Sequence, residues 1–326
     1  MNPLDVELLR IFRGAAMHQQ WSHLSEKLAA PVELLTERVQ ELRGAGFSIE
    51  EHPTLGLRLV DSPDRLIADD LLARLGPCET LREIVVYAQT DSTNNRAADA
   101  GRNGAASGLV IFAEEQTAGR GRFGRAWASA SHLGLWFSVL LRPPMPMARW
   151  PRLTTWTAVQ LARVIDAQTG GKTQIKWPND IYLNGRKAGG ILIETGVDAA
   201  QAPFAVIGIG LNVNQTPDDL PEELRGRATS IREAAGRRID RPEFAAAVLQ
   251  QLDTGLPGLI SDFAAIIEEA TQRSTLIGQW VEINTGASVI QGTATGLDPE
   301  GQLLLRTGDG ALQSVSAGEA TLQARQ

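Results

Sequence analysis

The sequence predicts a multidomain protein of the α+β class, and three observations support this. With 326 residues the chain is longer than one typical domain. Its first sixty residues are typical of short helices followed by a hairpin, while residues from about 276 onward contain only short strand-like runs between glycine-rich turns. Between these parts, strand-like runs come in consecutive pairs with interspersed helices, which favours an α+β layer over regular βαβ alternation.

Composition excludes several classes of protein. The chain is 43% hydrophobic and 21% charged, and 31 basic against 38 acidic side chains leave a net charge of −7. This balance provides no general field for nucleic acid or a membrane surface, so any basic site must be local. Cys78 is the only cysteine, and the four histidines are scattered, which argues against a disulfide framework and a metal cluster. No apolar run has membrane-spanning length, and Asp5 and Glu7 lie where a signal peptide would be basic. We expect a cytoplasmic protein with no membrane partner.

The N-terminal region has the element order of a winged helix-turn-helix. The first helix is indicated by an apolar stripe at i, i+3, i+4 and i+7, made by Leu8, Ile11, Phe12 and Ala15. Ser22 is expected to cap a second helix, and Pro31 suits the start of a third. Residues 47–51 and 55–60 then predict a hairpin. Helix, helix, turn, helix and hairpin is the order of a winged helix-turn-helix, and we assign it residues 1–63, ending at an Asp-Ser-Pro-Asp linker.

The charge of this region leaves DNA binding open. Over residues 1–65, seven basic against ten acidic side chains give a net charge of −3. DNA affinity rests largely on phosphate neutralisation, and the expected recognition helix carries three glutamates. The candidate DNA contacts are Arg38, Arg43 and Arg58.

In the rest of the chain, short apolar runs predict the strands, and one helix is indicated by its apolar spacing. Strands of the central region are expected at residues 83–88, 109–113, 133–141, 174–177, 190–194 and 204–208. An amphipathic helix is indicated by Ala158, Leu161, Ala162 and Ile165. The C-terminal strands are expected at residues 280–284, 289–297, 302–306 and 312–315, which predicts a small β-barrel.

The strongest functional signal is the stretch Gly119-Arg-Gly-Arg-Phe-Gly-Arg-Ala-Trp127. It contains G-x-G-x-x-G, but the residues after Trp127 predict a turn and then a strand, not the helix that a dinucleotide site needs. The loop places three guanidinium groups in six residues, at Arg120, Arg122 and Arg125. Guanidinium forks fit phosphate oxygens, and close packing of three would be unfavourable without a polyanion. A solvated basic turn is the alternative, and we favour a phosphate-binding loop.

Three further motifs carry polar side chains between apolar runs. Lys176-Trp-Pro-Asn-Asp180 is an unusual turn, and Lys187 precedes Gly-Gly and an apolar strand, which places a cation where the backbone can approach a ligand. Taken alone, Lys187 is more often a surface lysine. The stretches Asp91-Ser-Thr-Asn94 and Gly208-Ile-Gly-Leu-Asn-Val-Asn214 are weaker signals, and Ser-Thr-Asn commonly caps a helix.

Together these motifs resemble the bacterial biotin–protein ligases that carry an N-terminal DNA-binding domain and double as repressors of the biotin operon. The resemblance covers nearly the whole chain, and the arginine loop with Lys-Trp-Pro-Asn-Asp is its most specific part. It implies a class II synthetase-like α/β catalytic domain with a mixed sheet at 64–275 and an SH3-like β-barrel at 276–326. The related lipoate–protein ligases share the central fold but lack the arginine loop.

The resemblance also implies residue roles. The residues that it assigns to biotin are Ser92, Thr93, Asn94, Gln116, Arg120, Gly121, Arg122, Lys187 and Gly190. Those that it assigns to ATP are Arg120, Arg122, Arg125, Trp127, Lys176, Asn179 and Asn212. The catalytic candidates are Lys187, Arg122 and Asp180. Magnesium is implied as bound largely through the phosphates of ATP, without a dedicated metal cluster.

The implied reaction joins biotin to a lysine of a biotin carboxyl carrier protein through biotinyl-5′-AMP. The sequence contains no Ser-His-Asp or Cys-His arrangement, and this chemistry needs no side-chain nucleophile. Operator DNA and a second copy of the chain are further partners that the resemblance implies. Two alternatives stay open from the residues alone: a lipoate–protein ligase, and a catalytically silent regulator that senses biotin.

Overall fold

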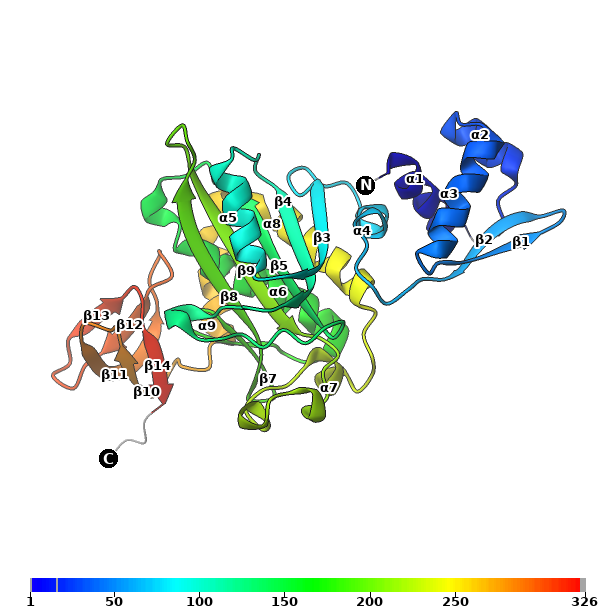
Figure 1. Cartoon of the computed structure of the whole chain (residues 1–326). Coiled ribbons are helices and arrows are strands. Elements are labelled where there is room, and N and C mark those ends of the chain that lie inside the picture. Colours follow the sequence, from blue (N-terminus) through cyan, green and yellow to red (C-terminus); the bar gives the residue numbers. More distant parts are fainter. Residues whose placement is uncertain (1, 16, 323–326) are drawn as a thin grey trace. The chain divides into compact units, whose positions relative to one another are not determined.

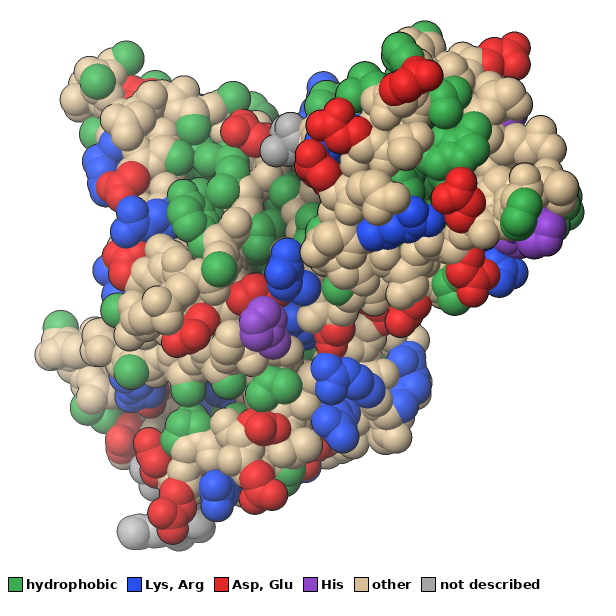
Figure 2. Space-filling model, turned by 45° about the vertical axis from the view of Figure 1, so that its right-hand side comes forward, with side chains coloured by type: hydrophobic (Ala, Val, Ile, Leu, Met, Phe, Trp, Pro, Cys, Tyr) green, Lys and Arg blue, Asp and Glu red, His purple; other side chains and the backbone are tan. Residues whose placement is uncertain are grey.

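The computed structural model describes residues 2–15 and 17–322, which form two compact units. The first unit comprises the described residues up to Pro77 together with 240–247, and the second comprises residues 78–239 with 248–322. Figure 1 shows the elements of each unit, and Figure 2 shows acidic and basic side chains interspersed on the visible face. Within the described ranges, no helix has the length and apolar character needed to cross a membrane.

The first unit has three helices, a two-stranded sheet and a further helix. The elements are α1 (Pro3–Gly14), α2 (Trp21–Leu28), α3 (Val32–Gly44), β1 (Ser48–His52), β2 (Gly56–Asp61) and α4 (Ala68–Arg74). Their apolar faces meet in one core, built around Leu8, Leu9, Phe12, Leu24, Leu35, Val39, Leu42 and Leu57. The N-cap of α2 is Gln20, so the expectation that Ser22 caps this helix is wrong, and Ser22 lies in its first turn.

The first unit continues past residue 63 because α4 packs on α1. The Asp70 carboxylate is buried and receives charge-assisted hydrogen bonds from Arg13 and from Arg74, the latter with Nε 2.9 Å from Oδ2. Arg74 in turn donates to Glu243 over 2.6 Å, at the start of α8 (Arg241–Ser261). The unit therefore extends beyond the 1–63 range expected from the linker composition, and its last part comes from a distant segment of the chain.

The second unit is built on a mixed seven-stranded sheet. The strand order is β3-β4-β5-β9-β8-β7-β6, and β3 and β4 are parallel while the other neighbours are antiparallel. The strands are β3 (Glu83–Thr90), β4 (Leu109–Gln116), β5 (Gly134–Leu141), β6 (Gln174–Lys176), β7 (Asp180–Leu183), β8 (Arg186–Val197) and β9 (Pro203–Asn212). Every residue of β5 is buried, as expected for a central strand whose sequence is an unbroken apolar run apart from Ser138. All the strands expected here are present, and β7 is an additional one.

Helices cover both faces of this sheet (Figure 1). On one face, α5 (Thr93–Arg102) places Ala97 against apolar side chains of β4, β5 and β9. On the other face, α6 (Arg152–Thr169) and α8 bring Trp156 and Leu252 against Val139 and Ile207. The remaining helices of the unit are α7 (Ile231–Ala235) and α9 (Phe263–Arg273).

A five-stranded antiparallel sheet follows α9. Its order is β13-β12-β11-β10-β14, and the strands are β10 (Trp280–Asn284), β11 (Val289–Leu297), β12 (Leu303–Arg306), β13 (Leu312–Val315) and β14 (Glu319–Leu322). Four of these strands are expected from the sequence, and β14 is not. Trp177, which follows β6 of the seven-stranded sheet, packs into the apolar core of this smaller sheet and donates its indole N–H to the Gly301 carbonyl over 3.1 Å. This contact ties the small sheet to the Trp-Pro-Asn-Asp turn.

Candidate functional site

One cavity of about 560 Å³ brings the sequence motifs together. Its walls come from the start of α5, the end of β4, the arginine loop, the β6–β7 turn, strands β8 and β9, residues 220–228 and the start of β14. The residues assigned above to biotin, ATP or catalysis that line it are Ser92, Thr93, Asn94, Gln116, Arg120, Gly121, Arg122, Arg125, Trp127, Lys176, Asn179, Asp180, Lys187, Gly190 and Asn212. Segments more than a hundred residues apart in sequence thus share one cavity.

At one end of the cavity, the start of α5 meets the end of β4. Ser92 is the N-cap of α5, and its side chain makes no capping hydrogen bond, so its hydroxyl is not used by the helix. The backbone N–H and the hydroxyl of Thr93 lie 2.8 and 3.1 Å from Gln116 Oε1. Gln116 Nε2 donates to Ser129 Oγ over 2.9 Å. The glutamine amide is therefore fixed between the helix start and the segment that follows the arginine loop.

Asn94 lies against the sheet at the same end. A Cβ built on Gly208 would lie 2.1 Å from Asn94 Oδ1, so only glycine at this position of β9 admits the amide. Ser138 Oγ lies 2.6 Å from Asn94 Oδ1, and Asn94 Nδ2 donates to Glu194 Oε2 over 2.7 Å. The Asn94 side chain is thus held at both ends of its amide.

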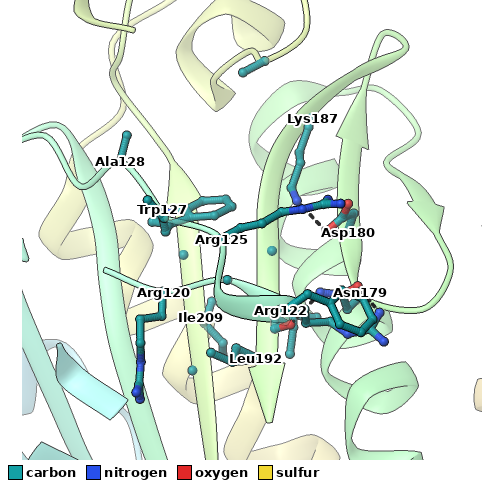
Figure 3. A pocket seen from close by; sticks show the side chains of 18 of the residues that line it. Arg120, Arg122, Arg125, Trp127, Ala128, Asn179, Asp180, Lys187, Leu192 and Ile209 are labelled. Atoms are coloured by element: carbon teal, nitrogen blue, oxygen red, sulfur yellow. Dashed lines mark hydrogen bonds and ion pairs between the residues drawn. The ribbon is translucent and has the colours of Figure 1, made fainter. Parts of the chain in front are cut away.

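The three arginines of the loop point in different directions (Figure 3). Arg120 pairs with Glu194 at 3.0 Å, Arg125 pairs with Glu319, and Arg122 Nη1 donates over 3.2 Å to Asn179 Oδ1 and to the Gly318 carbonyl. The expectation that the three charges are packed together and need a polyanion is wrong, because each guanidinium has its own acceptor within the protein. Arg120 is directed away from the other two, toward the end of the cavity that contains Asn94.

A tight backbone turn produces this divergence. The Gly121 N–H donates to the Arg125 carbonyl over 2.7 Å, and Arg122–Gly124 form a short 3-10 turn in which Phe123 has a φ of 57°. Phe123 is 62% exposed and lies beside the Arg122 guanidinium. The loop therefore presents an aromatic side chain outward while Arg122 reaches inward. Burial lowers the pKa of Arg122 from its ordinary value.

Lys187 and Asp180 form an ion pair inside the cavity, with Nζ 2.6 Å from Oδ1 (Figure 3). The two residues come from adjacent strands, β8 and β7. Lys187 Nζ also lies 5.3 Å from the centre of the Trp127 ring, within the range of a cation–π contact. The ammonium group is therefore held between a carboxylate and an aromatic face.

Trp127 rests on two glycines of the sheet. Cβ atoms built on Gly190 and Gly210 would lie 3.1 and 2.7 Å from its indole, so side chains there would displace the ring. Its edge meets the Trp136 ring at 70°, with centroids 6.3 Å apart. The role of Gly190 in this structure is thus to admit Trp127 against β8 and β9. Among the described residues, the buried indole N–H has no hydrogen-bond acceptor.

The Trp-Pro-Asn-Asp turn braces the far end. The Trp177–Pro178 peptide bond is cis, and Asn179 exchanges hydrogen bonds with Ile191, donating from Nδ2 over 2.8 Å and accepting at its carbonyl over 2.9 Å. Lys176 Nζ lies 6.0 Å from the Tyr182 ring centre. Asn212 is buried and donates to the Thr229 carbonyl over 3.0 Å, which ties β9 to the segment carrying Leu220 and Leu224. Asn179 and Asn212 therefore serve at least as supports for the walls.

Several site residues were not found from the sequence. Glu194 and Ser138 bind Asn94, Glu319 binds Arg125, and Arg227 lines the cavity. Glu194 follows the apolar Ile-Leu-Ile run of β8, and Ser138 interrupts the apolar run of β5, so both carry a local signal. Glu319 and Arg227 lie in ordinary polar contexts. Within residues 2–15 and 17–322, no group of three or more His, Cys, Asp or Glu side chains could hold a metal ion.

Comparison with known proteins gives matches over the same segments. Residues 86–214 match the Biotin/lipoate A/B protein ligase family, and residues 276–322 match the Biotin protein ligase C terminal domain. The bifunctional ligase/repressor BirA of Bacillus subtilis (strain 168) is 34% identical over 295 residues, covering 90% of this chain and 91% of the relative. The biotin–[acetyl-CoA-carboxylase] ligase of Mycobacterium tuberculosis is 36% identical over 273 residues, covering 78% and 94%. A solved structure, a biotin protein ligase from Aquifex aeolicus in complex with biotin and ATP, matches with a TM-score of 0.64 at 29% identity and covers 75% of this chain and 100% of that one.

Proposed function

The chain belongs to the biotin–protein ligases of the biotin/lipoate A/B protein ligase family, and from this premise we propose that it activates biotin with ATP and transfers it to a lysine of a biotin carboxyl carrier protein. The observation that carries the proposal is the single cavity in which the arginine loop, the Lys187–Asp180 pair, the Trp127 ring and the polar start of α5 meet. One end offers hydrogen-bonding hydroxyl and amide groups, with Arg120 paired to Glu194, and the other end is cationic. This suits a neutral bicyclic vitamin with a carboxylate tail joined to a nucleotide.

The first step is attack by a biotin carboxylate oxygen on the α-phosphorus of ATP, with loss of pyrophosphate. Two anions must approach each other, and negative charge accumulates on the phosphates. Fixed cations directed at that charge stabilise the transition state, because they need no reorganisation when the reaction occurs. We assign this role to Lys187 and Arg122, whose partners Asp180 and Asn179 are adjacent in sequence. Asp180 holds the ammonium group in place before the substrates arrive.

The nucleotide base and the biotin ring fit the remaining walls. Trp127 lies flat on Gly190 and Gly210 and offers an aromatic face for the adenine. Thr93, Asn94 and Gln116, with Ser92 beside them, offer hydrogen bonds for the ureido group of biotin. Arg120 is bound to Glu194 at this end of the cavity, so we assign it to the biotin end and not to the phosphates.

Magnesium fits the site as an ion held mainly by the nucleotide. Asp180 is a carboxylate of the cavity wall that could face such an ion, and the described residues offer no cluster of three ligands. Mg²⁺ commonly binds through one or two carboxylates together with substrate phosphates. When bound, it would neutralise part of the phosphate charge.

The second step is attack by the neutral amine of the carrier lysine on the acyl carbonyl of biotinyl-5′-AMP, with departure of AMP. The mixed anhydride is destroyed by water, so the wall formed by the arginine loop and the start of β14 must shield it until the carrier arrives. Arg122 and Arg125 fasten that wall through Gly318 and Glu319. No side-chain nucleophile takes part.

The test is transfer of biotin to a purified biotin carrier domain with ATP and Mg²⁺, detected with labelled streptavidin, with excess lipoate as competitor. The proposal expects a product that depends on ATP and that lipoate does not suppress. Suppression by lipoate would favour a lipoate–protein ligase. Binding of biotin without any transfer would instead identify a regulator that only senses the vitamin.

We propose operator DNA binding as a second function, carried by a winged helix-turn-helix formed by α2, α3 and the β1–β2 hairpin. It is supported by the relatives named bifunctional ligase/repressor, which match over 90% or more of this chain. The structure argues against Arg38 as a DNA contact, because its guanidinium is held by Asp5 at 2.6 Å and by Glu41 at 2.8 Å. Arg43 and Arg58 remain as candidates, each paired with a carboxylate that phosphate would have to replace.

This second function is tested by selecting duplexes from a random pool with the chain loaded with biotin and ATP. A recovered sequence motif, together with weaker binding of an Arg43→Ala or Arg58→Ala variant, is the expected result. Recovery of no motif would restrict the N-terminal unit to a non-DNA role.

We further propose that the C-terminal five-stranded sheet is an SH3-like barrel, supported by its strand order and single apolar core.

A further inference from the structure

Glu194 connects two parts of the site that are distant in sequence. Its carboxylate accepts a hydrogen bond from Asn94 Nδ2 over 2.7 Å and pairs with Arg120 Nη2 over 3.0 and 3.2 Å. Asn94 belongs to α5, Arg120 lies at the start of the arginine loop, and Glu194 belongs to β8. Both partners line the cavity, whereas Glu194 is not among the lining residues. The carboxylate is thus placed to act on the ligand through these two neighbours.

The charge of Glu194 sets the direction of the hydrogen bonds beside it. An ionised carboxylate can only accept, so it must face the NH₂ side of the Asn94 amide. The amide oxygen then faces Ser138 Oγ, 2.6 Å away, and accepts its hydrogen bond. Ser138 Oγ also lies 2.8 Å from Thr93 Oγ1, and the Thr93 hydroxyl donates to Gln116 Oε1 over 3.1 Å. The carboxylate therefore fixes which side of the Asn94 amide faces Ser138 and which faces Glu194.

The same set of contacts holds the arginine loop on both sides. At the start of the loop, Arg120 pairs with Glu194. Just after the loop, Ser129 accepts a hydrogen bond from Gln116 Nε2 over 2.9 Å, and Gln116 Oε1 in turn accepts from the Thr93 backbone N–H. Asn94 and Thr93 are adjacent at the start of α5, so a ligand that fixes them also fixes the anchors of the loop.

Resting on the ligase function proposed above, we infer that Glu194 is a positioning residue for biotin: it orients the Asn94 amide toward the vitamin and couples that contact to the arginine loop through Arg120. Hydrogen bonds to charged groups contribute more than neutral ones, and an orphaned buried partner adds a penalty. Loss of the carboxylate should therefore weaken biotin binding on the order of tenfold.

The first experiment compares Glu194→Gln with a charge-matched control, Glu83→Gln, which removes an exposed carboxylate from β3 of the same sheet. Biotin affinity is measured by titration calorimetry without ATP, and KM for ATP by the transfer assay. We expect biotin binding about tenfold weaker in Glu194→Gln, with KM for ATP nearly unchanged, and wild-type values for the control. Equal biotin affinity in Glu194→Gln and wild type would overturn the inference.

The second experiment tests whether Glu194 acts through Asn94. In an Asn94→Ala background, adding Glu194→Gln should cause little further loss of biotin affinity, because the group it orients is gone. Full additivity of the two losses would overturn the positioning role. Hydrogen exchange of residues 117–128 should also slow less on biotin addition in Glu194→Gln than in wild type, and identical slowing would count against the coupling.

Folding and function are separated by two further comparisons. If Glu194→Gln does not fold, Ser138→Ala removes the hydroxyl at the other end of the Asn94 amide and should weaken biotin binding similarly, while wild-type affinity would overturn the inference. A wild-type chain that neither binds nor transfers biotin would overturn the proposed function. An active wild type with insensitive Glu194 and Ser138 variants would overturn this inference alone.

Discussion

Lys187 illustrates how a single cation is prepared for its role. Its Nζ lies 2.6 Å from Asp180 and beside Trp127, so its position is fixed before substrates bind. Lys187→Ala should fold normally and lose adenylate formation by about 10²–10³ in rate, because one preorganised charge contact is removed. Pyrophosphate release measures this step, and the exposed Lys172→Ala is the matched control. Near-normal pyrophosphate release would refute the role assigned to Lys187.

Cys78 shows how burial alters a residue outside the site. Burial, followed by the charge of Asp253, raises the pKa of its thiol to about 11. At pH 8 the thiolate fraction should then be about two orders of magnitude below that of an unperturbed cysteine, and alkylation should slow in proportion. Iodoacetamide labelling followed by mass spectrometry should give a rate that rises until the pH approaches 11. A rate that levels off near pH 9 would contradict the raised pKa.

At the scale of elements, β8 and β9 form a flat shelf because they carry glycine where Trp127 rests. Gly210→Ala would place a methyl group 2.7 Å from the indole, so the ring must move. We expect KM for ATP to rise about tenfold or more, since stacking and orientation of the base are lost, while biotin affinity changes little. Gly171→Ala, whose added methyl group would make only an ordinary contact at 3.7 Å, should behave as wild type. Unchanged KM for ATP would show that the shelf does not serve the nucleotide.

Helices α1 and α3 are joined by an ion pair. The Asp5 and Arg38 side chains are 8% and 13% exposed, and the contact raises the pKa of Arg38 above its ordinary value, chiefly through the hydrogen bonds that Arg38 donates to Asp5. Asp5→Ala leaves a largely buried guanidinium with only Glu41, and should destabilise the first unit by about 3 kcal/mol. Hydrogen exchange of residues 3–44 measures this loss. Removing Glu7 from its exposed pair with Arg10 should cost under about 1 kcal/mol, and an equal effect of the two variants would contradict the argument.

Local patterns predict elements better than they predict contacts between them. The C-terminal strands at 280–284, 289–297 and 312–315 coincide with the structure because their apolar runs end at glycine turns. Strand β14 has four residues and acquires its conformation by pairing with β10, which no local pattern indicates. Likewise, the motifs predict which residues line the cavity, whereas the partners Glu194, Ser138 and Glu319 depend on the tertiary fold.

For the whole molecule, the division into two units has a thermodynamic consequence. All residues that line the cavity belong to the second unit. Biotin at a hundred times its Kd should stabilise that unit by about 2.7 kcal/mol, because only its folded state binds. Hydrogen exchange with and without biotin should therefore slow in residues 78–239 and 248–322 and stay unchanged in residues 3–61. Equal slowing in both ranges would mean that the two units unfold as one.

The cavity wall includes Ser92 and also Gly318, Glu319 and Ala320. A ribosome makes these segments in order, so most of the central sheet can form while β14 is still inside the exit tunnel. Until β14 pairs with β10, Arg122 and Arg125 lack their acceptors on Gly318 and Glu319. A nascent chain without a paired β14 would leave this wall unfastened and biotinyl-5′-AMP open to water, so we expect a protected adenylate only after β14 has been made and has paired with β10.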